Sequence, residues 1–286
     1  MSQDQLIIIK EQLSQIVDML ILNGTLTECP GLVHGKMGIV IFFFHYARFT
    51  GNELFADYAY SLLAEIQSQL HVNSPADYEN GIAGIGVGVD YLIRRNFLVT
   101  EEDIFDDLDQ RMTRAVLYDP WRDFSLYSGL VGYGRYWIMR LRYESSSVCK
   151  CLSFIIERIK EKLPYISNEE RIDVYCFLHD LRMSGFNGCL NLSKIIQEES
   201  LLPVGLNHFC SRLDNSVIGR TVQTFQNKWY FNDIFQEEID DPLNQLLDLD
   251  VKKTPISMGL LTGYSGEGLL RLTTINKMDM SWMTLL

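Results

Sequence analysis

Apolar residues recur at three- and four-residue steps along most of this chain, and that period is typical of amphipathic helices. The segment from Asp4 to Leu22 follows it, and charged residues interrupt its apolar run, so we expect an amphipathic helix there. Residues 39–46 form a broad apolar stripe, the chain breaks at Gly51, and the period resumes over residues 54–66. This spacing predicts two helices joined by a short turn, which is one helical hairpin.

A short motif, a polar residue followed by Gly-x-x-Gly, returns where each hairpin should begin. We call its clear copies the first, second, third and final glycine motifs, and they open with His34-Gly35, Asn80-Gly81, Ser128-Gly129 and Thr262-Gly263. The leading glycines of the first three copies lie 46 and then 48 residues apart, which is the length of one hairpin repeat. A weaker copy opens with Ser184-Gly185. The period predicts an all-α protein of about six hairpin repeats, with a glycine motif at the start of each inner helix.

The second and third units repeat this order of elements. In the second, a helix over residues 85–93 breaks near Asn96, and Thr100 before acidic residues predicts the N-cap of the next helix. In the third, we expect helices over 133–141 and 145–163, with Pro164 ending the latter. Between residues 168 and 250 the repeats are degenerate, and helices are expected over 169–183, 190–199 and 229–239. Residues 1–30 would supply an N-terminal outer helix and a loop.

The residue before each leading glycine is predicted to cap a helix, because Asn, Ser and Thr accept hydrogen bonds from free backbone N–H groups. Glycine then lets the backbone turn sharply and lets neighbouring helix ends approach closely. In a ring of hairpins the helix starts would line one funnel, where exposed N–H groups favour an anionic or carbonyl-bearing ligand. The alternative is that the glycines serve packing alone.

Composition narrows the class of protein. The chain has no linker rich in Pro, Gly or Ser, so we expect a single domain over residues 1–286. Its formal charge of −12 argues against nucleic acid as a partner, because phosphate binding needs a basic face. We expect no secretory signal and no membrane span. The six scattered cysteines favour reduced thiols and a cytoplasmic location.

The glycine motifs resemble those of lanthionine synthetase C-like proteins. The likeness rests on residues 32–58, 77–86, 126–132 and 259–266, covers most of 31–143 and 255–275, and is thin between them. It implies an α/α toroid, in which an outer ring of helices surrounds an inner ring. It also implies action on ribosomally made peptides, where a cysteine thiol adds to a dehydrated Ser or Thr to close a thioether ring. Family members hold zinc with two cysteines and a histidine, and zinc lowers the pKa of the attacking thiol.

This chain lacks the family's zinc motifs. The positions before the leading glycines hold His34, Asn80, Ser128 and Thr262, and none is cysteine. His208 and Cys210 lie in the degenerate region, but their order is reversed and no glycine follows them. We therefore expect no zinc and no other cofactor.

Two residues are candidates for proton transfer. His34 occupies the funnel-facing slot of the first motif and would serve as a base, although it could instead only cap a helix. Asp77 stands four residues before Gly81 and matches a family aspartate near the cavity, although aspartate is also common in loops before helices. The aromatic residues around the third motif, Tyr133 among them, would be core or cavity lining.

The favoured interpretation is a zinc-free protein that binds a peptide substrate, a precursor peptide or a partner modifying enzyme at the funnel mouth. Its contact residues would be Gly35, Asn80, Gly81, Ser128, Gly129, Thr262 and Gly263. One alternative is an active thioether cyclase that uses His34 and Asp77. Another is a carbohydrate-active toroid enzyme, for which Glu267 is the nearest acidic partner of Asp77. The acidic run of residues 237–241 is most simply a solvated helix end, and it could instead receive a basic leader peptide.

Overall fold

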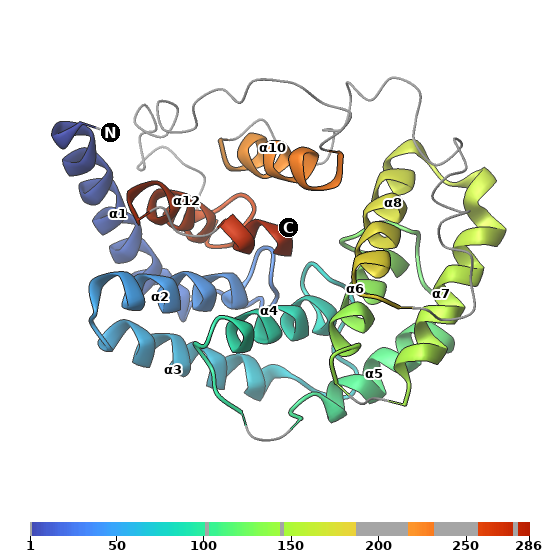
Figure 1. The fold of residues 1–286 in the computed structure, drawn as a ribbon. Helices are drawn as coiled ribbons and strands as arrows, with labels where there is room; N and C mark the ends of the chain where they lie inside the picture. Colours follow the sequence, from blue (N-terminus) through green and yellow to red (C-terminus); the bar gives the residue numbers. More distant parts are fainter. Residues whose placement is uncertain (1, 101–102, 144–145, 187–216, 232–256, 277–279) are drawn as a thin grey trace. The chain divides into compact units, whose positions relative to one another are not determined.

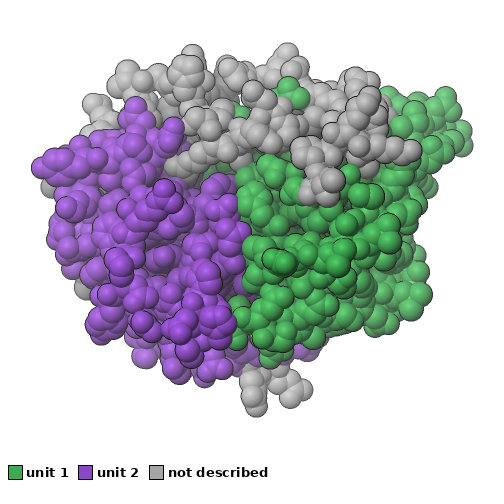
Figure 2. Space-filling model, turned by 180° about the vertical axis from the view of Figure 1, so that it is seen from behind, with its two compact units in different colours: residues 1–70, 212–286 green, residues 71–211 purple. Residues whose placement is uncertain are grey.

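The computed structural model describes residues 2–100, 103–143, 146–186, 217–231, 257–276 and 280–286, and within them all regular secondary structure is helical (Figure 1). The all-α prediction is therefore confirmed. The chain divides into two compact units, one of residues 1–70 and 212–286 and the other of residues 71–211 (Figure 2). We call them unit 1 and unit 2, and each is described by itself.

Unit 1 joins the two ends of the sequence. It contains α1 (Gln3–Gly24), α2 (Lys36–Thr50), α3 (Leu54–Gln69), α10 (Val217–Phe231), α12 (Tyr264–Asn276) and the short 3-10 helix η4 (Met280–Leu285). Helix α12 packs against both α1 and α2, and α2 packs along α3. The N-terminal helix therefore has the final glycine-led helix as its main neighbour, although more than 200 residues separate them in the sequence.

The α2–α3 hairpin forms as its sequence predicts. Helix α2 ends at Gly51, which has a φ of +67° in the left-handed region that glycine adopts easily. The Asn52 side chain accepts a hydrogen bond from the backbone N–H of Leu54 and starts α3. Between the helices, the Phe43 and Tyr58 rings meet edge to face with centroids 4.8 Å apart, which is a favourable aromatic geometry.

Unit 2 is built around α6 (Leu130–Arg140). Its other elements are α4 (Ile82–Arg94), α5 (Asp106–Leu117), α7 (Val148–Lys162), η1 (Leu163–Tyr165) and α8 (Asn168–Met183). Helix α6 contacts α4, α5, α7 and α8, so it is the central helix of the unit. Pro164 lies in η1, directly after α7, where a proline was expected to end the helix.

Glycine-led helices pack against one another by one repeated contact. A Cβ placed on Gly86 of α4 would lie 2.7 Å from the Tyr136 ring of α6, and one on Gly268 of α12 would lie 2.3 Å from the Phe42 ring of α2. The ring sits seven residues after the leading glycine in both partners. Because a side chain at either glycine would overlap the ring, the glycines allow these helix pairs to pack closely.

Several predicted boundaries are wrong. Thr100 is not an N-cap, since α5 begins at Asp106 after Phe105. Ser184 and Gly185, which were expected to open a glycine motif, form the end of α8, and Gly185 has a φ of +76°. Helix α7 begins at Val148, three residues later than expected.

The degenerate region is described only in part. The expected helix over 229–239 meets the structure only at its start, where α10 covers Val217–Phe231. The expected helix over 190–199, the acidic run of 237–241, and Gly188 of the weak motif lie outside the described residues.

Candidate functional site

All four clear glycine motifs fold into the same backbone turn. In each, the N–H of the residue after the leading glycine donates to the carbonyl oxygen seven positions earlier, and the distance is 2.9 Å every time. The four bonds are Lys36 to Cys29, Ile82 to Pro75, Leu130 to Asp123 and Tyr264 to Ser257. We call this structure the glycine turn. The sequence repeat is therefore also a repeat of backbone geometry.

The leading glycine is required for space and not for an unusual backbone angle. Gly35 and Gly81 have φ values of −119° and −112°, which any residue can adopt. A Cβ on Gly35 would lie 2.4 Å from the carbonyl oxygen of Cys29, and one on Gly81 would lie 2.3 Å from that of Pro75. At these two positions the close approach is to the folded-back carbonyl of the same turn, whereas the prediction was a close approach of neighbouring helix ends.

The predicted capping role of the residues before these glycines is wrong. The leading glycine is itself the N-cap of α2, α4 and α6, and no side chain caps these helices. Helix α12 begins at Tyr264, so Thr262 also stands one residue too early. His34, Asn80, Ser128 and Thr262 are instead half-buried between buried glycines and the preceding loop.

The N–H groups at these helix starts also differ from the prediction. In α2, Lys36 and Met37 donate to loop carbonyls, and Gly38 donates to Gly35. In α12, Tyr264, Ser265 and Gly266 donate to Ser257, Met258 and Gly259 in the same way. Because the turn uses these donors, they do not form the expected anion-binding surface.

Neighbouring glycine turns are joined in pairs by an identical bond. In unit 1, Leu260 of the final motif donates its N–H to the carbonyl of Val33 in the first motif at 2.8 Å. In unit 2, Tyr78 of the second motif donates to Tyr127 of the third at 3.0 Å. Donor and acceptor hold the same places in both pairs, three and two residues before the leading glycine. The final motif therefore donates to the first motif in the same way as the second motif donates to the third.

These pairs bring predicted site residues together. The first and final motifs, with His34 and Thr262, adjoin in unit 1, and the second and third, with Asn80 and Ser128, adjoin in unit 2. His34 and Asp77 belong to different units. Their action as base and orienting carboxylate therefore stays a prediction.

Asp77 has a structural role within its own turn. Its carboxylate accepts a hydrogen bond of 2.7 Å from the backbone N–H of Asn80. This bond fixes the chain just before Gly81, as aspartate often does in a loop before a helix.

The third motif contains a polar chain that sequence reasoning missed. The Asp123 carboxylate accepts hydrogen bonds from the backbone N–H and the hydroxyl of Ser125, at 2.9 and 2.5 Å. The Ser125 hydroxyl also lies 3.1 Å from the Ser128 hydroxyl. A carboxylate therefore orients two hydroxyls in series next to the leading Gly129. The spacing of an aspartate and a serine six and four residues before that glycine was the available signal.

Tyr133 of α6 lies close to the same two turns. Burial raises the pKa of its hydroxyl, and the negative charge of Asp77 raises it further. The hydroxyl therefore stays protonated at neutral pH and can act as a hydrogen-bond donor. Tyr133 is 9% exposed, so it belongs to the buried core, which is one of the two roles predicted for it.

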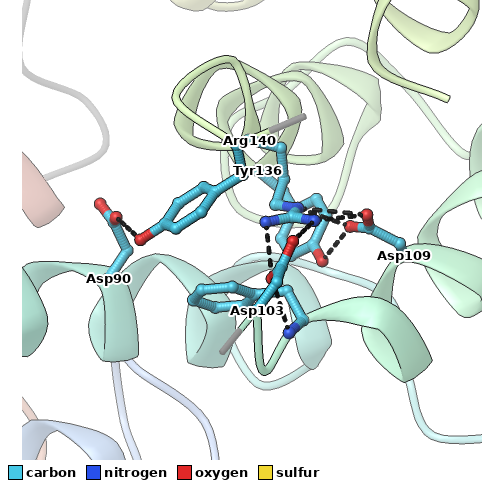
Figure 3. Close-up of polar contacts among 7 residues, drawn as sticks. Asp90, Asp103, Asp109, Tyr136 and Arg140 are labelled. Carbon is cyan, nitrogen blue, oxygen red and sulfur yellow. Dashed lines mark hydrogen bonds and ion pairs between the residues drawn. The ribbon is translucent and has the colours of Figure 1, made fainter. Parts of the chain in front are cut away.

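The largest polar cluster of unit 2 stabilises the fold (Figure 3). Arg140 is fully buried, and Asp103 and Asp109 both point to its guanidinium, with nitrogen–oxygen distances of 2.6 and 2.8 Å. The Tyr136 hydroxyl donates to Asp109 at 2.7 Å, and the Arg140 guanidinium also stacks over the Phe105 ring. Burial alone would lower the pKa of Arg140, but the bonds to Asp109 and Asp103 raise it. The cluster joins α5 to α6 and leaves this cation fully paired.

Unit 1 contains a weaker buried ion pair, and it involves Glu267, the residue that the carbohydrate-enzyme alternative names as the nearest acidic partner of Asp77. Glu267 is 4% exposed and lies 3.2 Å from Arg271 one turn later on α12. Gln12 of α1 accepts a hydrogen bond from Arg271, while the Nη2 atom of Arg271 is buried without a partner. Because Glu267 is buried in this pair, it is not presented to a substrate as a second carboxylate for Asp77.

Neither the thiols nor the metal-binding residue types assemble a zinc site in the described part of the chain. Burial raises the pKa of Cys151 to about 11 and raises that of Cys176 still more, so both are poor nucleophiles. No group of three or more His, Cys, Asp or Glu among the described residues could hold a metal ion. His208 and Cys210 lie outside those residues.

Comparison of the chain with protein-family models, with curated proteins and with solved structures found no match. Among the described helices, none combines the length and the apolar character needed to cross a membrane.

Proposed function

We propose that this chain is a lanthionine synthetase C-like protein that binds a peptide at its glycine turns without zinc. It would act in or beside the maturation of a ribosomally made peptide, in the cytoplasm. The observation that carries the proposal is the repetition of one backbone turn that presents a half-buried polar residue, His34, Asn80, Ser128 or Thr262, before each leading glycine. The four motifs of this chain are therefore alike in their hydrogen bonds as well as in their residues.

In this proposal the hairpins close into a toroid of about six repeats that forms a single domain. The support is the pairing of the final motif with the first, in the same register that joins the second to the third. An open solenoid has no reason to pair its first and last repeats, because each repeat contacts only its sequence neighbours. A ring makes those two repeats neighbours.

The side chains before the glycines suit a peptide main chain. An amide such as that of Asn80 both donates and accepts, and the hydroxyls of Ser128 and Thr262 do the same. A peptide backbone offers N–H and C=O groups in alternation, so neutral groups of this kind can pair with it without a charged ligand. The use of the helix-start N–H groups within the turns supports this preference for a neutral ligand.

A synthetic peptide that contains one dehydrobutyrine and one cysteine tests the proposal. We expect the untagged full chain to bind it in fluorescence anisotropy, and Asn80→Ala and Ser128→Ala each to weaken binding at least about fivefold, the loss of one net hydrogen bond. Asn52→Ala, in the α2–α3 turn, is the matched control and should bind as the parent does. Absence of binding, or equal loss in the control, contradicts the proposal.

Two further measurements separate the zinc-free binder from a cyclase. Elemental analysis of untagged protein should find much less than one zinc per chain, and stoichiometric zinc overturns the zinc-free part of the proposal. Mass spectrometry after thiol alkylation should find the peptide cysteine still free. A thioether product that disappears in His34→Ala would establish the enzymatic alternative instead.

A further inference from the structure

Helix α1 has a second ordered face that no described element covers. Its inner face packs on α12 and α2 through residues that are at most 4% exposed: Ile9, Leu13, Ile16, Val17 and Leu20. A capping box between Ser2 and Gln5 fixes the first turn of the helix. Gln12 of α1 also accepts a hydrogen bond from the buried Arg271 of α12. The outward face is therefore held in place from its first turn onward.

The outward face has a regular composition. Residues 4, 7, 11, 14, 18 and 21 are all exposed and are spaced alternately by three and four, so they form one stripe along the helix. We call these six residues the outer stripe. Asp4, Glu11 and Asp18 occupy one set of positions, seven residues apart, and Ile7, Ser14 and Ile21 occupy the other set. Acidic and largely apolar positions thus alternate in the pattern of a helix-pairing seam.

Large apolar side chains of this helix are exposed beside its acidic residues. Ile7 is 53% exposed and Ile21 is 42% exposed, and Ile8 and Leu22, beside the stripe, are 43% and 68% exposed. Leu26, just after the helix, is 73% exposed. An amphipathic partner helix binds through apolar anchors at this kind of spacing.

The charges of the stripe are not balanced within the described part of the protein. Asp4, Glu11 and Asp18 form no ion pair with another described residue. Lys10 is the one basic residue of α1. Burial raises the pKa of Tyr46 on α2, and the negative charge of Asp18 adds to that rise, so the field of the stripe reaches the neighbouring helix.

We propose that the outer stripe of α1 is the docking surface for a basic amphipathic helix of another protein. Carboxylates seven residues apart lie about 10.5 Å apart along a helix, so they match Lys or Arg residues at every seventh position of a partner helix. Apolar residues between those cations would cover Ile7 and Ile21. A second copy of this chain is a poor occupant, because it would set the three carboxylates against three more.

A designed peptide tests this proposal with the full chain. The probe is a fluorescein-labelled helical 21-mer with Lys at every seventh position and Leu in the intervening seam positions; its control carries Glu in place of Lys. At about 50 mM salt, where charges are weakly screened, the Lys peptide should bind saturably in fluorescence anisotropy, and the Glu peptide should not.

Charge reversal in the protein locates the site. Glu11→Lys should weaken binding of the Lys peptide about tenfold, because it replaces an attraction by a repulsion. Glu157→Lys, an equal change at an exposed position of α7, should change the dissociation constant less than twofold. Both residues are exposed, so circular dichroism should show parental helicity in each.

Three results would overturn the proposal. One is the absence of saturable binding, and another is an equal loss in Glu11→Lys and Glu157→Lys. The third is a dimer of the parent chain in sedimentation that dissociates in Ile21→Ser, since this would assign the stripe to self-association. None of these measurements involves the glycine turns, so the outcome is independent of the peptide-binding proposal.

Discussion

The two pairs of glycine turns share a backbone and differ in their side chains. In unit 1 and unit 2 alike, the neighbouring turns are joined through the same atoms at nearly the same distances. In unit 2, the side chains of Asp77, Asp123 and Ser125 form hydrogen bonds within the turns, whereas in unit 1 the Ser265 hydroxyl donates to the Met258 carbonyl and the Cys29 sulfur accepts from the Gly31 N–H. The fold of the turn therefore depends on glycine and on main-chain hydrogen bonds. Its polar side chains can differ from one motif to the next without changing that fold.

The buried ion pairs differ between the units in the same way. Arg140 in unit 2 is bonded to two carboxylates and stacks on Phe105 and Tyr143. Arg271 in unit 1 has one carboxylate partner and a buried nitrogen without any. Burial lowers the pKa of Arg271, despite the charge of Glu267, while the bonds of Arg140 outweigh its burial. The two arginines are equally buried, but Arg140 belongs to a well-bonded cluster and Arg271 to a single ion pair.

The largest expected effect comes from removing these two cations. Arg140→Met should lower the free energy of unfolding by about 3–5 kcal/mol, because it leaves Asp109 buried without its cation. Arg271→Met should cost less, about 2–3 kcal/mol, because it also leaves a carboxylate, Glu267, buried without its cation but breaks fewer bonds and removes a buried donor without a partner. Urea denaturation measures both changes. Equal losses in the two variants would contradict the difference between the clusters.

A smaller effect is expected at the leading glycines, and here the units should agree. Gly35→Ala and Gly81→Ala should each cost about 3 kcal/mol, because the new methyl group overlaps a turn carbonyl and forces the backbone to shift. Gly51→Ala is the control. Its φ of +67° and open surroundings predict a loss of only about 1 kcal/mol. If Gly35→Ala and Gly81→Ala differ widely, the two turns are not equivalent.

The side-chain bonds of the third motif should make a smaller contribution. Ser125→Ala removes the link between Asp123 and Ser128 and should cost about 1 kcal/mol, the usual net value of one hydrogen bond. Thr262→Val, in the final motif, should change stability by less than about 0.5 kcal/mol, as half-buried substitutions away from such bonds do. Thermal unfolding by circular dichroism compares the two. A larger loss in Thr262→Val would reverse the contrast between the turns.

Acid should affect unit 2 through two carboxyls. Burial would raise the pKa of Asp103, but bonds from Arg140 and from the Phe105 N–H hold it below its ordinary 3.8. Burial would likewise raise the pKa of Glu170, but the N–H groups of Phe124 and Ser167 lower it below 4.5. A lowered folded-state pKa stabilises the protein above the unfolded-state value, and this stabilisation is lost as the pH falls through the folded-state value.

Asp103→Asn should therefore make the melting temperature depend less on pH below about pH 4. Asp107→Asn, an exposed change on α5, should leave that dependence as it is in the parent. The melting temperature measured at several pH values between 6 and 3 gives the comparison. A steeper pH dependence in Asp103→Asn would contradict the role of its carboxylate.

Sequence patterns predicted the parts of the fold that local chemistry determines. The apolar period located α1, α2, α3, α4 and α8 to within a few residues, because each helix buries one face. The interruption of the apolar period identified Gly51 as a break, and the structure shows a positive φ there. Gly185 also has a positive φ, but it was assigned to a helix start because the residues around it resemble the glycine motif. A Gly-x-x-Gly pattern by itself does not separate the end of one helix from the start of another.

The site was predictable in position but not in chemistry. The spacing of the motifs placed His34, Asn80, Ser128 and Thr262 before the helix starts, as found. Their capping role was wrong, because the loop carbonyls that satisfy the helix-start N–H groups come from the backbone and leave no signal in residue types. The Asp123–Ser125–Ser128 chain depends on how the turn folds back on itself, which a linear pattern does not contain.

Unit 1 is assembled from the first and last quarters of the chain, with α1 packed on α12. On a translating ribosome, α1 and α2 leave the exit tunnel long before their partner α12 has been synthesised. Residues 71–211 are synthesised earlier, and the described helices among them pack on one another, so this unit can fold first. Until α12 has been synthesised, α1 lacks its main packing partner, and most of its apolar inner face stays exposed to solvent and to chaperones.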